Sequence, residues 1–152
     1  MNYWLLKSDP DEFGWEDLKK QSQQRSIWDG VRNYQARNFL MEMQRGDLAL
    51  FYHSSTQPQH ISGIVSIVKE AYPDFTQFDK NHVHFDPKAI EDDPTWFMVD
   101  IQIEREILPP ITRDELKKVA SLREMLLFRN SRLSVLPVAK DHWKKILGLR
   151  NL

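Results

Sequence analysis

The sequence predicts an α/β (α+β) protein built on a small mixed β-barrel of about five or six strands flanked by short helices. Short apolar or alternating runs, which are typical of strands, recur along the chain and are separated by turn residues. Capping residues and apolar residues at helical spacing indicate short helices between these runs. No repeat, low-complexity tract or internal linker interrupts the 152 residues, so we expect a single domain over 1–152.

The N-terminal part of the chain predicts one strand and two helices. The strand is expected at Tyr3–Lys7, and Asp9-Pro10 with Glu12 forms a capping-box pattern that predicts a helix directly after it. Asn33 is a favourable N-cap for the second helix. Its apolar face is expected to consist of Ala36, Phe39, Leu40 and Met43, and Gly46-Asp47 to follow its end.

Three further segments account for the middle of the chain. Buried strands are expected at Leu48–His53 and at Ile61–Val68, and Gly63 inside the second indicates a bulge or a close backbone approach. Tyr72–Asp74 predicts a turn, and an irregular acidic segment follows as far as Pro94. The alternation over Trp96–Glu106 predicts a half-buried strand, closed by Pro109-Pro110.

The C-terminal part carries two capping boxes, a strand and a helix. Thr112 with Glu115, and Ser121 with Glu124, have the capping-box spacing and predict two short helices. A last strand is expected at Arg132–Pro137, and a last helix at Lys140–Leu147, ended by Gly148.

Composition places the chain among soluble globular proteins, with 41% hydrophobic and 28% charged residues. No apolar run approaches the length of a membrane span, and the N-terminus lacks the basic and apolar regions of a signal peptide. The absence of cysteine excludes disulfides, thiolate metal sites and a cysteine nucleophile. We therefore predict a cytoplasmic protein that does not contact membranes; the sequence leaves its oligomeric state open, a monomer included.

The net charge of −1 conceals an asymmetry along the chain. Residues 70–106 carry 10 acidic and 3 basic side chains, whereas residues 111–152 carry 4 acidic and 10 basic ones. If the basic segment lines one face, that face attracts phosphate groups. Alternatively, the two segments pair with each other.

The stretch Ser26–Leu40 concentrates the polar and aromatic residues that are not needed for folding. Trp28, Asp29, Arg32 and Asn33 precede the helix, where an aromatic ring beside an anion-attracting helix N-terminus suits a nucleobase and its phosphate. The alternative is a buried core tryptophan next to a structural Asp–Arg pair.

No pattern specifies a catalyst. The chain has neither common phosphate-binding glycine loop and no nucleophile elbow. His82, His84 and Asp86 have a spacing compatible with metal ligands, but no fourth ligand is evident and a surface histidine pair is preferred. Neither a metal nor a cofactor is expected. An enzyme that acts on a modified nucleotide, with Asp29 or His53 as the base, remains an alternative.

Seven ordered blocks together resemble the EVE domain family, whose members have a PUA-like fold. They cover almost the whole chain, from Tyr3 to about Leu147. The blocks are Trp4–Pro10, Trp28–Asn33, Tyr34–Phe39, Gly46-Asp47, Phe51–Ser54, Tyr72–Asp74 and Arg132–Val138. The resemblance implies a small β-barrel with flanking helices, similar to YTH readers of methylated adenine.

This resemblance also implies a function. The family's implied role is recognition of a modified base, chiefly 5-methylcytosine or its oxidised forms in DNA, with modified RNA as the alternative. Carried onto this sequence, the expected base pocket comprises Ser8, Trp28, Asp29, Gly30, Val31, Asn33, Tyr52 and Ser54. The expected phosphate or nucleic-acid contacts are Lys7, Arg32, Arg37, Arg132 and Ser134. In this hypothesis Trp28 stacks on the base, while Asp29 and Asn33 bind its polar edge.

Overall fold

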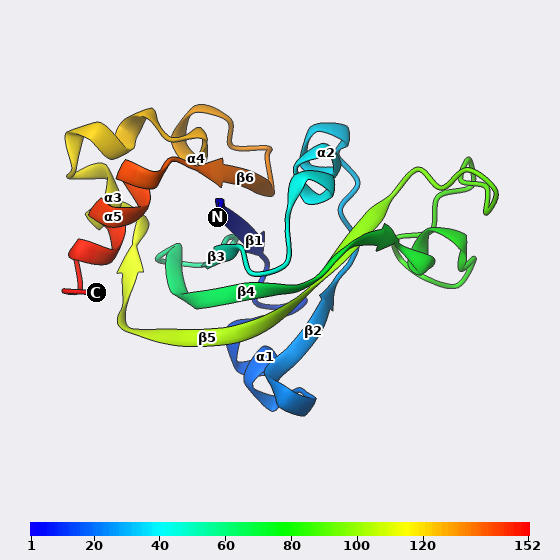
Figure 1. Cartoon of the computed structure of the whole chain (residues 1–152), viewed down its shortest axis with the longest axis horizontal. Coiled ribbons are helices and arrows are strands. Elements are labelled where there is room, and N and C mark those ends of the chain that lie inside the picture. Colours follow the sequence, from blue (N-terminus) through cyan, green and yellow to red (C-terminus); the bar gives the residue numbers. More distant parts are fainter.

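The computed structural model describes residues 1–152 and consists of one strongly curved mixed sheet with helices around it (Figure 1). The six strands lie in the order β2-β5-β4-β3-β1-β6, so β2 and β6 are the two edges. They are β1 (Tyr3–Ser8), β2 (Arg25–Trp28), β3 (Leu48–His53), β4 (His60–Pro73), β5 (Phe97–Thr112) and β6 (Val135–Val138). Only β1 and β3 pair in parallel, and the remaining neighbours are antiparallel. The mixed α/β fold of about six strands is therefore confirmed.

Five α-helices surround the sheet. They are α1 (Trp15–Lys20), α2 (Tyr34–Glu42), α3 (Arg113–Lys117), α4 (Leu126–Arg129) and α5 (Lys140–Gly148), with 3-10 turns at Ser22–Gln24, Phe75–Phe78 and Ala120–Glu124. Helices α3, α4 and α5 gather at one end of the molecule, and the irregular segment 74–96 projects from the other (Figure 1). No helix is long and apolar enough to cross a membrane.

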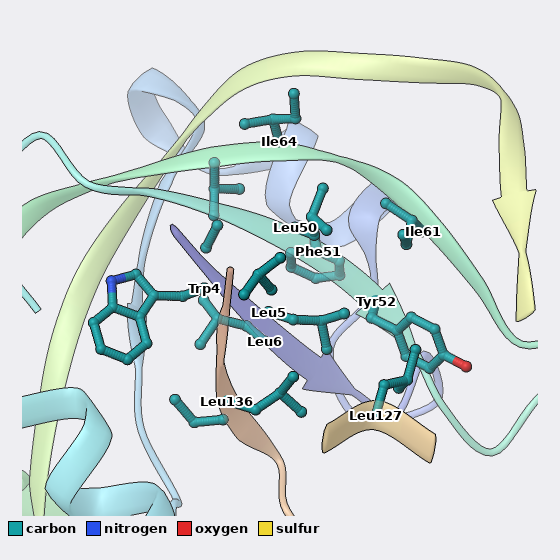
Figure 2. Close-up of a cluster of buried hydrophobic side chains, with 14 of the residues drawn as sticks. Trp4, Leu5, Leu6, Leu50, Phe51, Tyr52, Ile61, Ile64, Leu127 and Leu136 are labelled. Carbon is teal, nitrogen blue, oxygen red and sulfur yellow. The ribbon is translucent and has the colours of Figure 1, made fainter. Parts of the chain in front are cut away.

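The core lies inside the curve of the sheet. Apolar side chains of β1, β3, β4 and β6 meet there, and α4 adds Leu127 next to Tyr52 (Figure 2). The central ones are Trp4, Leu5, Leu6, Leu50, Phe51, Ile61, Ile64 and Leu136. This arrangement explains the almost uninterrupted apolar run of β3, because both of its faces are covered.

Gly63 marks a close approach, as the sequence indicates. The register of β4 shifts on both sides of this residue, and a Cβ atom placed on it would lie 2.3 Å from the indole ring of Trp15. Glycine is therefore the one residue that lets α1 pack directly on β4.

Helix α2 and the last helix follow their sequence signals. The side chain of Asn33 accepts a hydrogen bond from the backbone N–H of Ala36, as an N-cap does, and Ala36 and Leu40 are buried. Thr112 and Glu115 form the predicted capping box of α3, and α5 begins at Lys140 and ends at Gly148.

Two of the predicted helix starts are wrong. The carbonyl of Asp9 accepts hydrogen bonds from Glu12 and Phe13 in a single turn, and the helix begins only at Trp15 after the extended Gly14. At Ser121 the hydroxyl accepts from Lys145 Nζ instead of capping a helix, so that segment forms a 3-10 turn. The Asp9 side chain caps only this single turn, by accepting the backbone N–H of Asp11, whereas the Ser121 hydroxyl has Lys145 as its partner.

Two predicted boundaries in the sheet are also wrong. Strand β4 continues through Tyr72 and Pro73, because both pair with the start of β5, and Asp74 then caps a 3-10 turn. Strand β5 passes through Pro109 and Pro110 to Thr112. The prolines fall in a bulge between the pairs Gly63–Glu106 and Ile61–Ile111, where no ladder N–H is required.

Candidate functional site

Two adjoining hollows open around the carboxyl end of β1. The first, which we call the Trp28 hollow, has a volume of about 610 Å³. It is lined by Lys7, Ser8, Asp9, Glu12, Phe13, Ser26, Ile27, Trp28, Asp29, Gly30, Val31, Arg32, Asn33, His82, Val83, His84 and Ser134. The second, the basic hollow, has a volume of about 550 Å³. It is lined by Lys7, Ser54, Ser55, Gln57, Pro58, Gln59, Arg113, Asp114, Leu127, Ser131, Arg132, Leu133 and Ser134.

Trp28 belongs to both the core and the first hollow. It ends β2, is 7% exposed and packs edge-on against Phe51 with the ring centroids 5.6 Å apart. The core therefore holds its ring in place, and its small exposed part forms the wall of the hollow. The structural Asp–Arg pair considered above also exists, but the partner of Arg32 is Asp74 and not Asp29.

Asp29 and Asn33 offer unused polar groups to the Trp28 hollow. The carboxylate of Asp29 is half-buried and accepts no hydrogen bond from the protein, and the side-chain nitrogen of Asn33 donates none. The oxygen of Asn33 is occupied as the helix cap. One free acceptor and one free donor thus line the same cavity, an arrangement that matches the polar edge of a base.

Arg32 lies beside the same hollow but holds a neighbouring loop. Its guanidinium donates to the carbonyls of Val31 and His84, to the Asp74 carboxylate at 3.1 Å and to the Thr76 hydroxyl. These five hydrogen bonds use all five N–H groups of the side chain. Arg32 therefore holds this loop in the structure, and a phosphate contact by its guanidinium would require one of these hydrogen bonds to break.

Asp74 is the counterpart of Arg32 and is fully buried. Its carboxylate accepts hydrogen bonds from the backbone N–H groups of Gly30 and Thr76 as well as from Arg32. Burial alone would raise the pKa of this carboxyl, but these hydrogen bonds and the charge of Arg32 outweigh burial and lower the pKa. Asp74 therefore links the 74–96 segment to the Trp28 hollow as an ionised group.

Two histidines of the 74–96 segment line the Trp28 hollow. Nδ1 of His82 accepts the backbone N–H of His84, and the ring of His84 lies so close to Gly30 that a Cβ atom there would be 2.6 Å from it. Gly30 also has a φ of +81°, which a side chain would strain. Their spacing in the sequence predicts a surface pair, and only the fold of the chain brings them to the wall of the Trp28 hollow. The protein presents no group of three or more side chains arranged to bind a metal ion.

The basic hollow collects three cations from separate parts of the chain. Lys7 is the last residue but one of β1, Arg113 begins α3 and Arg132 lies in the loop before β6. Nζ of Lys7 donates to the carbonyl of Ser131 at 3.3 Å, and burial together with Arg113 lowers the pKa of Lys7. Ser134, an expected nucleic-acid contact, lines this hollow, and so does Ser54, which belongs to the expected base pocket but does not line the Trp28 hollow. Arg113 was not predicted, because nothing in the sequence places it next to Lys7.

The acidic segment 70–106 and the basic segment 111–152 do not pair with each other in the structure. None of the four ion pairs joins residues 70–106 to residues 111–152. The acidic 74–96 segment and the C-terminal helices lie at opposite ends of the molecule (Figure 1). The basic side chains that line the second hollow are thus not neutralised by the acidic segment.

Two of the predicted site residues lie outside both hollows. Tyr52 is fully buried, its hydroxyl donates to Gln59, and burial raises its pKa to about 12, partly offset by Arg113. It therefore supports the wall of the basic hollow from behind. Arg37 donates to the carbonyl of Thr95 and lies over the ring of Tyr34, so it joins α2 to the end of the irregular segment that precedes β5.

His53, considered above as a catalytic base, is also absent from the hollows. Its Nε2 accepts the backbone N–H of Trp15, so we assign the ring proton to Nδ1, which lies 2.9 Å from Nε2 of His60. Nδ1 of His60 in turn reaches the carbonyl of Pro58. Burial and the charge of His60 lower the pKa of His53, while Asp17 opposes them. This chain of hydrogen bonds joins α1, β3 and β4.

A model of the EVE domain matches residues 2–149. The chain belongs to the EVE domain family. It is 47% identical over 165 residues to thymocyte nuclear protein 1 of Mus musculus, covering 97% of this chain and 73% of that protein.

Solved structures agree with this assignment. The EVE chain superimposes on a crystal structure of human THYN1 protein in complex with DNA containing 5-methylcytosine with a TM-score of 0.96 and 43% identity. That match covers 100% of this chain and 99% of the human one. A YTH domain of Zygosaccharomyces rouxii, solved with N6-methyladenosine RNA, shares the fold with a TM-score of 0.57 at 15% identity. The expected PUA-like fold is therefore confirmed.

Proposed function

We propose that this EVE domain is a non-enzymatic module that binds a modified base, 5-methylcytosine or an oxidised form of it in DNA, in the Trp28 hollow. The observation that carries the proposal is the unused carboxylate of Asp29 next to the unused side-chain nitrogen of Asn33, in a cavity walled by Trp28. The human relative, which aligns over the full length of this chain, was crystallised with DNA containing 5-methylcytosine.

The polar groups of the hollow suit cytosine. The exocyclic amine of cytosine is a donor that a carboxylate such as Asp29 accepts. The ring nitrogen N3 and the carbonyl O2 are acceptors that the side-chain nitrogen of Asn33 can supply with a hydrogen bond. These contacts and the wall of Trp28 must together offset the few kcal/mol that extruding a base from its stack costs.

A methyl group adds little affinity by itself. Burying one carbon contributes about 0.8 kcal/mol, which corresponds to about fourfold in affinity. We therefore expect the module to prefer 5-methylcytosine over cytosine by a modest factor. Larger discrimination requires a polar contact that only an oxidised form offers.

The test is a binding titration with labelled oligonucleotides at one fixed salt concentration. The panel carries cytosine, 5-methylcytosine, 5-hydroxymethylcytosine or N6-methyladenine in matched DNA and RNA strands, and fluorescence anisotropy reports binding. We expect saturable binding to one modified cytosine in DNA. Asp29→Asn should weaken it by about tenfold, because it replaces a charged acceptor by a neutral amide oxygen, which accepts a weaker hydrogen bond.

The matched control is Asp92→Asn, which removes the same charge from an exposed position outside both hollows. It should leave the affinity unchanged. Equal affinity for all oligonucleotides, or an equal effect of the two variants, would contradict the proposal. Tighter binding to the RNA strands would reassign the module to modified RNA, and turnover of a nucleotide with a bell-shaped pH dependence would reveal an enzyme.

A further inference from the structure

We infer that the basic hollow is a phosphate-binding subsite, anchored by Arg113, for the nucleotide whose base occupies the Trp28 hollow. That one nucleotide occupies both hollows rests on the proposed function, whereas phosphate binding in the basic hollow is argued from that hollow alone. Three observations support it: uncompensated charge, an Arg side chain with free donors, and residues that line both hollows.

The charge of the basic hollow is not neutralised within the protein. Lys7, Arg113 and Arg132 line it, against a single acid, the exposed Asp114. None of these three cations takes part in an ion pair. Like charges brought together in this way repel each other, and the lowered pKa of Lys7 has burial and Arg113 as its causes. A bound anion would relieve this repulsion.

Arg113 is held in place while its donors remain free. Its backbone N–H donates to the carbonyl of Gln59, and its guanidinium lies over the ring of Phe128 at 5.0 Å. The guanidinium makes no hydrogen bond to the protein, although the residue is half-buried. A planar, positioned guanidinium with five unused N–H groups is the geometry that binds phosphate oxygens in pairs.

The two hollows are parts of one continuous surface. Lys7 and Ser134 line both of them, and the backbone N–H of Lys7 donates to the carbonyl of Ser134 at 2.9 Å, which closes the edge between β1 and β6. A ligand that reaches from one hollow into the other must pass these two residues. A nucleotide has this form, because a sugar separates its base from its phosphate.

The decisive experiment removes the charge of one phosphate at a time. Oligonucleotides with a single 5-methylcytosine carry a neutral methylphosphonate at the 5′ side, at the 3′ side or at a distant position. We expect one of the two flanking substitutions to weaken binding by about tenfold, and the distant one to have less effect. The variant Arg113→Gln should bind the unmodified backbone about tenfold more weakly and should lose its sensitivity to the flanking substitution.

Arg105→Gln is the matched control, because Arg105 is exposed on β5, lies outside both hollows and carries the same charge. It should keep the sensitivity of the parent protein. If the flanking substitutions weaken binding to Arg113→Gln as much as they weaken binding to the parent protein, the inference is wrong while the proposed function stands.

A second measurement separates the two ideas when no oligonucleotide binds. Titration with inorganic phosphate, followed in ¹H–¹⁵N NMR spectra, should shift the amide signals of Ser54 and Ser134 in the parent protein and in Arg105→Gln, but not in Arg113→Gln. Such shifts without oligonucleotide binding would overturn the proposed function and keep the phosphate site. The absence of these shifts would overturn the phosphate site as well.

Discussion

The carboxylate of Asp74 accepts a hydrogen bond from the guanidinium of Arg32 at 3.1 Å, and no part of Asp74 is exposed to solvent. The same carboxylate accepts the backbone N–H of Gly30 at 2.8 Å. Arg32 also donates to the carbonyl of His84. This one ion pair therefore fixes the positions of both Gly30 and His84, which both line the Trp28 hollow. The shape of the Trp28 hollow therefore depends on a contact between segments more than forty residues apart in sequence.

Replacing Asp74 should lower the free energy of unfolding of the protein. Asp74→Ala leaves the Arg32 guanidinium without its counter-ion, and removing one partner of a buried pair costs about 3–5 kcal/mol. Urea denaturation measures this free energy of unfolding, and Asp92→Ala, at an exposed position of the same segment, should change it by less than about 0.5 kcal/mol. A similar small effect of both variants would show that the ion pair does not stabilise the fold.

A side chain at Gly30 should destabilise the protein and disturb the Trp28 hollow. Gly30→Ala places a Cβ atom on a residue with φ of +81°, which costs about 1–2 kcal/mol, and pushes the His84 ring away from its present position. The control is Gly148→Ala at the end of α5, where nothing lies within 4 Å of the new atom. Thermal unfolding should show a lower midpoint for the first variant and an unchanged or higher one for the second.

Because His53 is buried in its neutral form, the free energy of unfolding should decrease in mildly acidic solution. Burial lowers the pKa of His53 below its ordinary 6.5, so the unfolded chain takes up this proton at a higher pH than the folded one. The stability that neutral His53 provides is therefore complete above pH 6.5 and decreases as the pH falls below it.

This pH dependence is measured as the free energy of unfolding in urea between about pH 8 and about pH 5. His53→Gln should flatten the decrease, whereas His142→Gln, a half-exposed residue of α5, should not. An unchanged slope in His53→Gln would assign the acid sensitivity to another group.

The ion pair with Arg150 should keep the carboxyl group of Glu115 ionised in acidic solution. Two hydrogen bonds of 2.9 and 2.7 Å from Arg150, with the backbone N–H of Thr112, lower the pKa of Glu115 to about 2. Its contribution to stability is present above the ordinary pKa of 4.5 and is lost as the pH falls from there towards 2. Arg150→Lys cannot bind both oxygens in this way, so the pKa of Glu115 in an NMR titration should rise towards 4.5, whereas Arg129→Lys should leave it unchanged.

The sequence by itself determined those features that depend on neighbouring residues. The strand Leu48–His53, the cap of α2 at Asn33 and the capping box at Thr112 follow from local periodicity and local hydrogen bonds. The ordered motif blocks identified the EVE family from Trp4 to Val138. The local signal failed at Ser121, whose hydroxyl binds Lys145, and at Asp9, where the chain makes only one turn before the extended Gly14.

Only the tertiary structure decided which of the candidate residues share a cavity. Lys7, Arg113 and Arg132 are far apart in sequence, and they meet because β1 pairs with β6 while α3 follows the far end of β5. For the same reason Arg32 pairs with Asp74, and His84 lies against Gly30. A side chain's partners are set by which segments the sheet brings together, and that long-range pairing leaves no local pattern in the sequence.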